Sequence, residues 1–335
     1  MFIINKNKVA EAKKIINSSK KILVTGHTHP DGDAVGGSLA VYHYFKKLNF
    51  DVTIVMPDAI PSSVAWLPMA NEILFHDENK DRVGELVADA DVIFCVDFNE
   101  PKRLKSLKVP IEEAKATKIM IDHHPQPDDF VDITFSDTKI SSASEYVYYF
   151  LKEFDESNLD KTIAECLFLG IVTDTGSFVY SSATPSTFTA ASELLSYGID
   201  KQKILSNTLD NYSENRTRLM GYILHNKMVV LSEHKTAYIT ITKEEFDKFG
   251  YENGDHENFV NIPLSIKGIE ISALFMEIDD SIRLSFRSSG SFDVNLLARN
   301  HFNGGGHQKA AGGKTYKTLS ETVDRFVEII KSQIK

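Results

Sequence analysis

Cysteine, tryptophan and long apolar runs are scarce in this sequence of 335 residues, which has two cysteines and one tryptophan. Cys95 and Cys166 each lie in an apolar stretch, so we expect two separate buried thiols instead of a disulfide or a zinc-binding pair. No apolar run approaches the ~20 residues that a membrane-spanning helix needs. The N-terminus becomes charged too early for a secretory signal. We therefore expect a cytoplasmic protein with no membrane partner.

Basic residues are outnumbered as well, because 37 lysines and arginines face 47 aspartates and glutamates, for a net charge of −10. Proteins that coat long nucleic acid usually have a basic surface, so we expect no stable complex with a long strand. A small anionic substrate stays compatible with this charge, because bound divalent cations invert the local field of an acidic cleft. The composition favours a small phosphorylated substrate captured through metal.

The first half of the chain alternates strand and helix patterns, and its length favours two domains. The strand patterns are apolar at both odd and even positions, which suits strands buried on both faces of a parallel sheet. They are Lys21–Thr25, Asp51–Met56, Asp91–Val96 and Thr117–Ile121, and the helix patterns are Ala34–Leu48, Ser141–Phe154, Asp160–Val172 and Pro185–Tyr197. We predict an α/β fold whose N-terminal domain is a doubly wound parallel sheet.

In the second half of the chain, the residue patterns change to pairs of neighbouring strands. They predict a smaller C-terminal α/β domain with a mixed or antiparallel sheet. Its strand patterns pair Lys227–Leu231 with Ala237–Thr242, and Glu270–Glu277 with Ser281–Arg287; helix patterns follow at Val294–His301 and Leu319–Ile334. The polar helical stretch before it reads as a linker. We predict a catalytic domain at residues 1–199, a helical linker and hinge at 200–226, and a second domain at 227–335.

Acids and histidines follow three of the predicted strands, and the carboxyl ends of parallel strands share one edge of a sheet. They are His27, Asp31, Asp33, Asp97, Asp122, His123 and His124, with Asp174 at the end of a predicted helix. Carboxylates with imidazoles and no thiolate suit Mn²⁺ or Mg²⁺, and two such ions can clamp a phosphoryl group. Asp31 or Asp33 could instead cap the helix that begins near Ala34. Capping accounts for one residue but not for the set.

Four motifs occur in the order of a known family: HPDGDA (29–34), VDFN (96–99), DHH (122–124) and TDTGSF (173–178). They resemble the DHH phosphoesterase superfamily, and GGGHQKAAGG (304–313) resembles the glycine-rich motif of the type 1 DHH-associated domain. The chain is most similar to the compact branch that hydrolyses short oligoribonucleotides (nanoRNA) and removes the 3′-phosphate of pAp. That resemblance implies a two-metal-dependent phosphoesterase acting on a small nucleotide or a short single strand.

The resemblance also implies a role for each site residue. It assigns one metal to His27, Asp31 and Asp97, and the other to Asp33, Asp97, His123 and Asp174, with Asp97 bridging the two. We expect Mn²⁺, with Mg²⁺ or Co²⁺ as alternatives. His124 would face the substrate phosphate, and Asp122 would orient a histidine. His29 matches a variable position and is left outside the metal site.

The glycines Gly304, Gly305 and Gly306 would let backbone amides approach an anion, and HQKAA would begin a helix whose N-terminus favours phosphate. His307 and Lys309 would add donors, although a GGG loop alone is more often a flexible turn. Arg287 is a candidate for a second phosphate or the terminal nucleotide, with an exposed strand arginine as the alternative.

Other functions stay open at this point. The same metal core suits hydrolysis of pyrophosphate or polyphosphate, and of linear or cyclic dinucleotides such as pApA. A nucleotide-binding regulator without catalysis would lack one or more of the metal-binding side chains, and none is missing. The sequence leaves open the choice among these substrates, the direction of attack, the base preference, the role of His29, and whether the protein forms a homodimer.

Overall fold

The computed structural model describes residues 3–180, 182–209, 212–252 and 254–334. It divides into two compact units, Met1–Asn211 and Tyr212–Lys335. The boundary falls within residues 200–226, the range that we expected to be a linker. Helix α8 (Lys201–Leu209) contacts α6 of the first unit, whereas α9 (Glu214–Asn226) buries Leu219 and Ile223 in a core of the second unit. These two helices therefore pack in different units.

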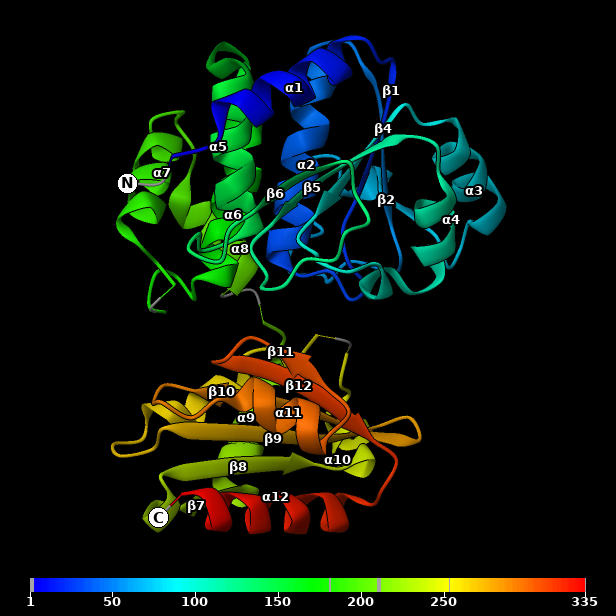
Figure 1. Cartoon of the computed structure of the whole chain (residues 1–335). Coiled ribbons are helices and arrows are strands. Elements are labelled where there is room, and N and C mark those ends of the chain that lie inside the picture. The colour runs from blue at the N-terminus through cyan, green and yellow to red at the C-terminus, as the bar shows by residue number, and fades with distance from the viewer. Residues whose placement is uncertain (1–2, 181, 210–211, 253, 335) are drawn as a thin grey trace. The chain divides into compact units, whose positions relative to one another are not determined.

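The first unit is built on a parallel sheet with the strand order β3-β2-β1-β4-β5-β6 (Figure 1). Its strands are β1 (Lys21–Thr25), β2 (Asp51–Met56), β3 (Leu74–Phe75), β4 (Val92–Val96), β5 (Thr117–Asp122) and β6 (Ile133–Ser136). The order reverses between β1 and β4, which is the topological switch point where doubly wound sheets bind ligands. The predicted doubly wound parallel sheet is confirmed.

Alternate residues of each strand enter different cores on the two faces of this sheet. Ile22 and Val24 of β1 pack in one core with α1, α2, α5 and α6, while Leu23 packs in the other with α3 and α4. Figure 1 shows α3 and α4 on the opposite side of the strands from α2 and α5. The helices are α1 (Lys6–Asn17), α2 (Gly32–Lys47), α3 (Lys80–Asp89), α4 (Lys108–Glu113), α5 (Ala143–Asp155), α6 (Lys161–Asp174) and α7 (Pro185–Leu195); η1 (Ala70–Glu72), η2 (Pro101–Leu107) and η3 (Glu156–Asn158) are 3-10 turns.

The second unit contains a mixed sheet in the order β11-β12-β10-β9-β8-β7, in which only the β8–β9 pair is parallel among the described strands. The strands are β7 (Met228–Leu231), β8 (Thr236–Ile241), β9 (Ile271–Ile278), β10 (Ser281–Ser288), β11 (Gly305–Gly306) and β12 (Ala310–Thr315). Helices α11 (Val294–His301) and α12 (Leu319–Gln333) cover one face. Helices α9 and α10 (Lys243–Phe249) cover the other, with the 3-10 turn η5 (Phe259–Ser265), and a further 3-10 turn, η4 (Ser232–His234), links β7 to β8.

Side-chain caps account for where several helices begin. Asp31 caps α2, Ser142 caps α5, and Thr318 with Glu321 forms a capping box on α12. Helix α7 begins with Pro185 at a position where the missing N–H costs nothing. These local signals explain why the helix patterns could be located from the sequence.

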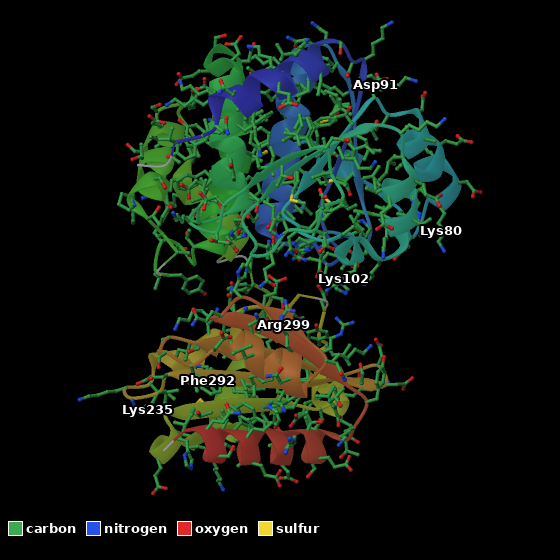
Figure 2. All side chains as sticks on the ribbon, in the orientation of Figure 1. Lys80, Asp91, Lys102, Lys235, Phe292 and Arg299 are labelled. Atoms are coloured by element: carbon green, nitrogen blue, oxygen red, sulfur yellow. The ribbon has the colours of Figure 1, made fainter. Side chains whose placement is uncertain are left out.

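Charged side chains such as Lys80, Asp91 and Lys102 lie exposed at the surface of the first unit (Figure 2). Cys95 and Cys166 are both buried and free, as expected, and burial raises the pKa of the Cys95 thiol to about 12. Among the described residues, no helix has both the length and the apolar character that crossing a bilayer requires.

Candidate metal centre

The loop after β1 and the first residue after β4 meet at the switch point of the first sheet. His27 follows β1, and Asp97 follows β4 with a backbone φ of +65°, a conformation that aspartate tolerates better than most residues. The backbone N–H of Asp97 donates to Ile121 O at 3.0 Å, which ties the residue to β5. Parallel-strand geometry therefore brings these side chains to one edge of the sheet.

The two carboxylate oxygens of Asp97 face two different histidines. Its Oδ2 lies 3.3 Å from His27 Nε2, and its Oδ1 lies 3.4 Å from His123 Nε2. All three residues are buried. His27 Nδ1 lies 2.7 Å from the carbonyl oxygen of Thr28, which can only accept, so Nδ1 carries the proton and Nε2 keeps a lone pair in the neutral ring. Asp97 thus stands between two imidazoles, one of which is held ready as a ligand.

Asp33 is buried on α2 and held by the first turn of α5. Its Oδ2 accepts a hydrogen bond from Ala143 N at 2.6 Å, and its Oδ1 accepts one from Ser144 N at 2.8 Å. A helix N-terminus favours a negative charge through its free amides and its dipole. No local pattern predicts this contact, because SSAS (141–144) is the sequence of an ordinary helix start.

Asp174 is the last residue of α6 and joins the second group of ligands. Its Oδ2 lies 3.6 Å from His123 Nε2, and Asp33 Oδ2 lies 3.9 Å from the same nitrogen. Close packing of α2 against α6 makes this possible, because a Cβ on Gly36 would lie 2.5 Å from the carbonyl oxygen of Cys166. Glycine at the helix crossing therefore sets the spacing of the two acids.

Asp31 both caps a helix and lies in a group of potential metal ligands, two roles that we expected to be alternatives. Its Oδ1 accepts from Asp33 N at 3.0 Å and Ala34 N at 3.1 Å, so it does cap α2. The same residue forms a group with His27 and Asp97 whose ligand atoms all lie within 4.8 Å of one another. Its side chain is 59% exposed, which leaves room for a further partner on its outer oxygen.

His124 points to a separate set of partners. Its Nδ1 lies 2.8 Å from Asp122 Oδ1, and its backbone N–H donates to Asp122 Oδ2 at 2.9 Å. Arg103 Nη1 lies 2.9 Å from His124 Nε2 and 3.3 Å from the carbonyl oxygen of Asp97. Arg103 was missed from the sequence, although it and Arg82 are the two arginines among residues 1–199. That rarity is the signal that could have identified it.

Burial and neighbouring charges shift the pKa values of Asp33, His123 and Asp97. Burial raises the pKa of Asp33 well above its ordinary value, and the charges of Asp97 and Asp174 raise it further. Burial opposes the charged form of His123, but Asp174 and Asp97 outweigh it and hold its pKa well above the usual range. For Asp97, burial is outweighed by the adjacent imidazoles of His123 and His27, so its pKa is well below the ordinary value. The charges of these carboxylates and imidazoles therefore depend strongly on one another.

Three groups of side chains in the first unit could hold a divalent cation: His27 with Asp31 and Asp97, Asp33 with His123 and Asp174, and Asp97 with Asp122 and His124. Among the described residues, the buried atoms His27 Nε2 and Asp97 Oδ1 have no hydrogen-bond partner, and a bound cation would satisfy both. Oxygen and nitrogen ligands without thiolate suit Mn²⁺ or Mg²⁺. The donor set and its unsatisfied atoms therefore match metal ions.

His29 lies outside these groups, in a network at the rim of the site. Its backbone N–H donates to Asp58 Oδ1 at 2.7 Å, and its ring contacts Lys105 Nζ at 3.1 Å and Asp58 Oδ2 at 3.3 Å. Thr28 Oγ1 donates to Asp58 as well, at 2.9 Å. Asp58 thus anchors the loop that carries His27.

The glycine motif of the second unit differs from our expectation. Gly305 and Gly306 form β11, and β12 starts at Ala310, so HQKAA begins no helix; His307 and Ala310 exchange backbone hydrogen bonds across a tight turn. The glycines are needed because strands approach closely: a Cβ on Gly304 would lie 1.9 Å from Gly312 O. The predicted helix is wrong because hairpin pairing satisfies these backbone groups instead.

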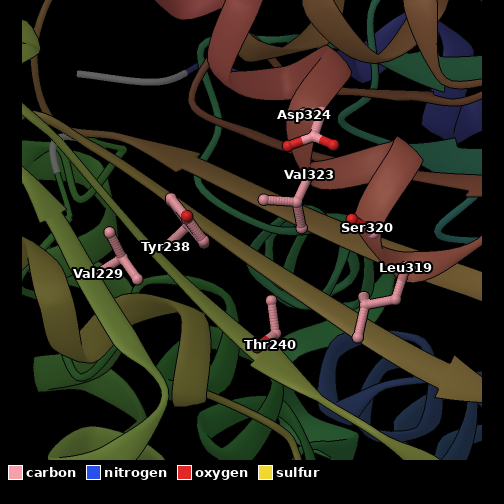
Figure 3. A pocket seen from close by; sticks show the side chains of 7 residues that line it. All are labelled: Val229, Tyr238, Thr240, Leu319, Ser320, Val323 and Asp324. Atoms are coloured by element: carbon pink, nitrogen blue, oxygen red, sulfur yellow. The ribbon is translucent and has the colours of Figure 1, made fainter.

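Arg287 lies beside this turn on β10, opposite Ala310 in the β10–β12 ladder. Its neighbour Ser288 donates to Lys309 O at 2.9 Å, so the arginine and the His307 turn belong to one surface of the second unit. A separate hollow of about 430 Å³ lies between β7, β8 and α12, with Tyr238 and Asp324 among its lining residues (Figure 3). It holds none of the residues predicted for the site.

Comparisons with known proteins follow the same division of the chain. Residues 21–171 match the DHH family, N-terminal domain, and residues 228–335 match the DHHA1 domain. The chain is 32% identical over 327 residues to the bifunctional oligoribonuclease and PAP phosphatase NrnA of Bacillus subtilis, covering 97% of this chain and 98% of that relative.

Two further proteins resemble this chain over most of its length. The chain is 26% identical over 339 residues to the cyclic-di-AMP phosphodiesterase GdpP of Bacillus subtilis, covering 95% of this chain but 48% of the relative. It superposes on the crystal structure of an exopolyphosphatase-related protein from Bacteroides fragilis with a TM-score of 0.96 and 41% identity, covering 99% of this chain and 98% of that one.

Proposed function

Because this chain belongs to the DHH family, we propose that it is a two-metal-dependent phosphoesterase that hydrolyses short oligoribonucleotides and the 3′-phosphate of pAp. The likeness to NrnA of Bacillus subtilis supports this choice, since it extends over nearly the full length of both chains. The likeness to GdpP covers about half of that protein, which makes a cyclic dinucleotide the second candidate.

One observation carries the proposal: Asp97 lies between the two groups of ligands. Its oxygens face His27 in one group and His123 in the other, at 3.3 and 3.4 Å. A carboxylate shared in this way is what two metal ions close to each other require. We assign one ion to His27, Asp31 and Asp97, and the other to Asp33, Asp97, His123 and Asp174. We expect Mn²⁺, with Mg²⁺ or Co²⁺ as alternatives.

Such ions, when bound, would activate a water and neutralise charge on the phosphate. The chain's own residues orient and stabilise the reacting groups. Asp122 fixes the ring of His124 through Nδ1, so Nε2 is directed away from that carboxylate. We assign proton transfer beside the phosphate to His124, with Nε2, which Arg103 Nη1 also contacts, as the accepting nitrogen. In the second unit, Arg287 and the His307 turn would bind the distal part of the substrate.

The test is a panel of substrates supplied with Mn²⁺: pAp, di- to pentanucleotide RNA, pApA, a long single strand and pyrophosphate. We expect turnover of pAp and the short RNAs, and little of the long strand. Metal-dependent release of phosphate from pAp also excludes a regulator that binds nucleotides without catalysis. A preference for pyrophosphate would overturn the substrate class.

The bridging role of Asp97 needs its own variant. Asp97→Asn should lose turnover by at least about 100-fold and should bind less Mn²⁺, because one shared ligand serves both ions. Asp129→Asn is the matched control, since Asp129 is an exposed aspartate of the same unit. If Asp97→Asn kept the turnover and metal content of the control, the assignment of Asp97 would have to be abandoned.

A further inference from the structure

The side chain of Arg103 has N–H donors that no described residue accepts. It is partly buried beside the metal centre, where Nη1 contacts His124 Nε2 and the carbonyl oxygen of Asp97. Its Nε and Nη2 have no acceptor among the described residues, and it pairs with no described carboxylate although five aspartates lie in the cluster. A guanidinium has five N–H donors in a fixed fork, so most of its hydrogen-bonding capacity is unused.

The backbone around Arg103 is fixed from two sides. The carbonyl oxygen of Arg103 accepts a hydrogen bond of 2.8 Å from Thr28 N, in the loop that carries His27. Two residues later, Lys105 adopts φ +46° and ψ −115°, a strained conformation for a lysine, and its Nζ lies 3.3 Å from Asp58 Oδ2. Asp58 in turn anchors Thr28 and His29. The segment and the metal-binding loop are therefore locked together.

Lys105 provides an informative contrast with Arg103. Its ammonium already has acceptors in Asp58 and His29, so its hydrogen bonds are made to other residues of the chain. Arg103 faces a carbonyl and an imidazole, which leave its positive charge without a counter-ion. A partly buried, unpaired cation is costly unless an anion joins it. The anion that reaches this place in a phosphoesterase is the phosphate of the substrate.

We propose that Arg103 is a catalytic residue that binds a non-bridging oxygen of the scissile phosphate through its unused donors. It would act beside His124 and stabilise the negative charge that develops in the transition state. Arginine suits this role because its planar fork matches phosphate oxygens and because it stays charged at all relevant pH values. The inference rests on the proposed phosphoesterase function. In it, Arg103 of η2 supplies a positive charge next to the bound phosphate.

Three variants test the proposal: Arg103→Ala, Arg103→Lys and the matched control Arg82→Ala, which removes the exposed arginine on α3. In the Mn²⁺-loaded protein, Arg103→Ala should lower kcat/KM for pAp by about 100- to 1000-fold, the range for losing one pre-positioned charged donor. Its Mn²⁺ content should equal that of wild type. Inhibition by inorganic phosphate should weaken by about tenfold.

Chemical rescue separates catalysis from positioning. Added guanidinium ion should restore part of the activity of Arg103→Ala and none in the Asp97→Asn variant, whereas Arg103→Lys should stay impaired because an ammonium lacks the fork. Unchanged turnover of Arg103→Ala would overturn the proposal. A loss that parallels the loss of Mn²⁺, without rescue, would overturn it too, because Arg103 would then only hold the loop.

The two hypotheses fail in different ways. If wild type turned over neither pAp nor short RNA, the proposed function would fall. Binding of inorganic phosphate by the Mn²⁺-loaded wild type and Arg103→Ala proteins would still be measurable by calorimetry. Equal phosphate affinity in the two would then overturn the role of Arg103, and weaker binding by the variant would support it.

Discussion

The backbone N–H of Ala143 donates a hydrogen bond of 2.6 Å to Asp33 Oδ2, so the first turn of α5 holds a buried carboxylate of α2. Ser144 N holds the other oxygen at 2.8 Å. The amides fix the orientation of this carboxylate but do not neutralise it, because burial and the charges of Asp97 and Asp174 still raise its pKa well above the ordinary value. A divalent cation would neutralise the charge of the Asp33 carboxylate, which the helix amides only stabilise in part.

Replacing Asp33 by Asn tests this arrangement. The amide nitrogen of Asn would face the N–H of Ala143 or Ser144, and the negative charge would be lost. We expect Asp33→Asn to lose Mn²⁺-dependent turnover of pAp by at least about 100-fold. The rise in melting temperature on adding Mn²⁺ should also shrink, because a ligand stabilises only the form that binds it. Asp129→Asn should behave as wild type, and an equal Mn²⁺-induced rise in Asp33→Asn would contradict the role of Asp33.

The α2–α6 crossing predicts opposite effects for two glycine-to-alanine changes. Gly36→Ala places a Cβ 2.5 Å from the carbonyl oxygen of Cys166, so the helices must separate and we expect a loss of about 1–3 kcal/mol in unfolding free energy. Gly84→Ala on α3 meets nothing within 4 Å and should stabilise the protein by about 0.5–1 kcal/mol. Urea unfolding of both variants measures this. Equal effects of the two changes would show that close packing at Gly36 is unimportant.

His256 predicts a sensitivity of the second unit to acid. Burial lowers the pKa of His256 to about 4, with help from the positive charges of Arg283 and Arg216, against 6.5 for an exposed histidine. The unfolded chain therefore takes up a proton before the folded one, and stability is lost as the pH falls from 6.5 towards 4. The loss should reach roughly 2–3 kcal/mol at the lower end. Unfolding free energies of wild type and His256→Gln should converge across this range, and parallel curves would refute the prediction.

The glycine motif predicts different outcomes at neighbouring positions. A Cβ on Gly304 would lie 1.9 Å from Gly312 O, so Gly304→Ala should disrupt the β11–β12 hairpin and lower the melting temperature. Gly305 has its nearest neighbours at 3.7 Å, so Gly305→Ala should fold normally. If the motif binds substrate through its backbone, Gly305→Ala should raise KM for pAp and leave kcat nearly unchanged. An unchanged KM would remove Gly305 from the binding surface.

Much of the fold could be predicted because strands buried on both faces and capped helices leave plain signals. The run VIFCV before Asp97 and the proline that opens α7 are examples. The strand ends then brought His27, Asp97 and His123 together with no need for detailed packing. Strands β3 and β6 were missed, since two to four residues at the edges of a sheet carry little periodicity.

What escaped prediction depends on contacts between distant segments. No local pattern tells that the amides of Ala143 and Ser144 would meet Asp33, 110 and 111 residues away. Arg103 has the sequence surroundings of an ordinary surface residue, and only folding places it against His124. The helix expected after Gly306 failed because the glycines pair with Gly312 and Ala311, a non-local choice that local propensity does not contain.

The contacts that hold Asp31, Asp33 and His27 are made by groups of the chain itself, because backbone amides and the Thr28 carbonyl fix each side chain. A centre built in this way need not fold around its cofactor, in contrast to small zinc domains. The protein should survive removal of its ions by a chelator and regain them when they return. Turnover should then be lost and regained reversibly as the ions are removed and returned.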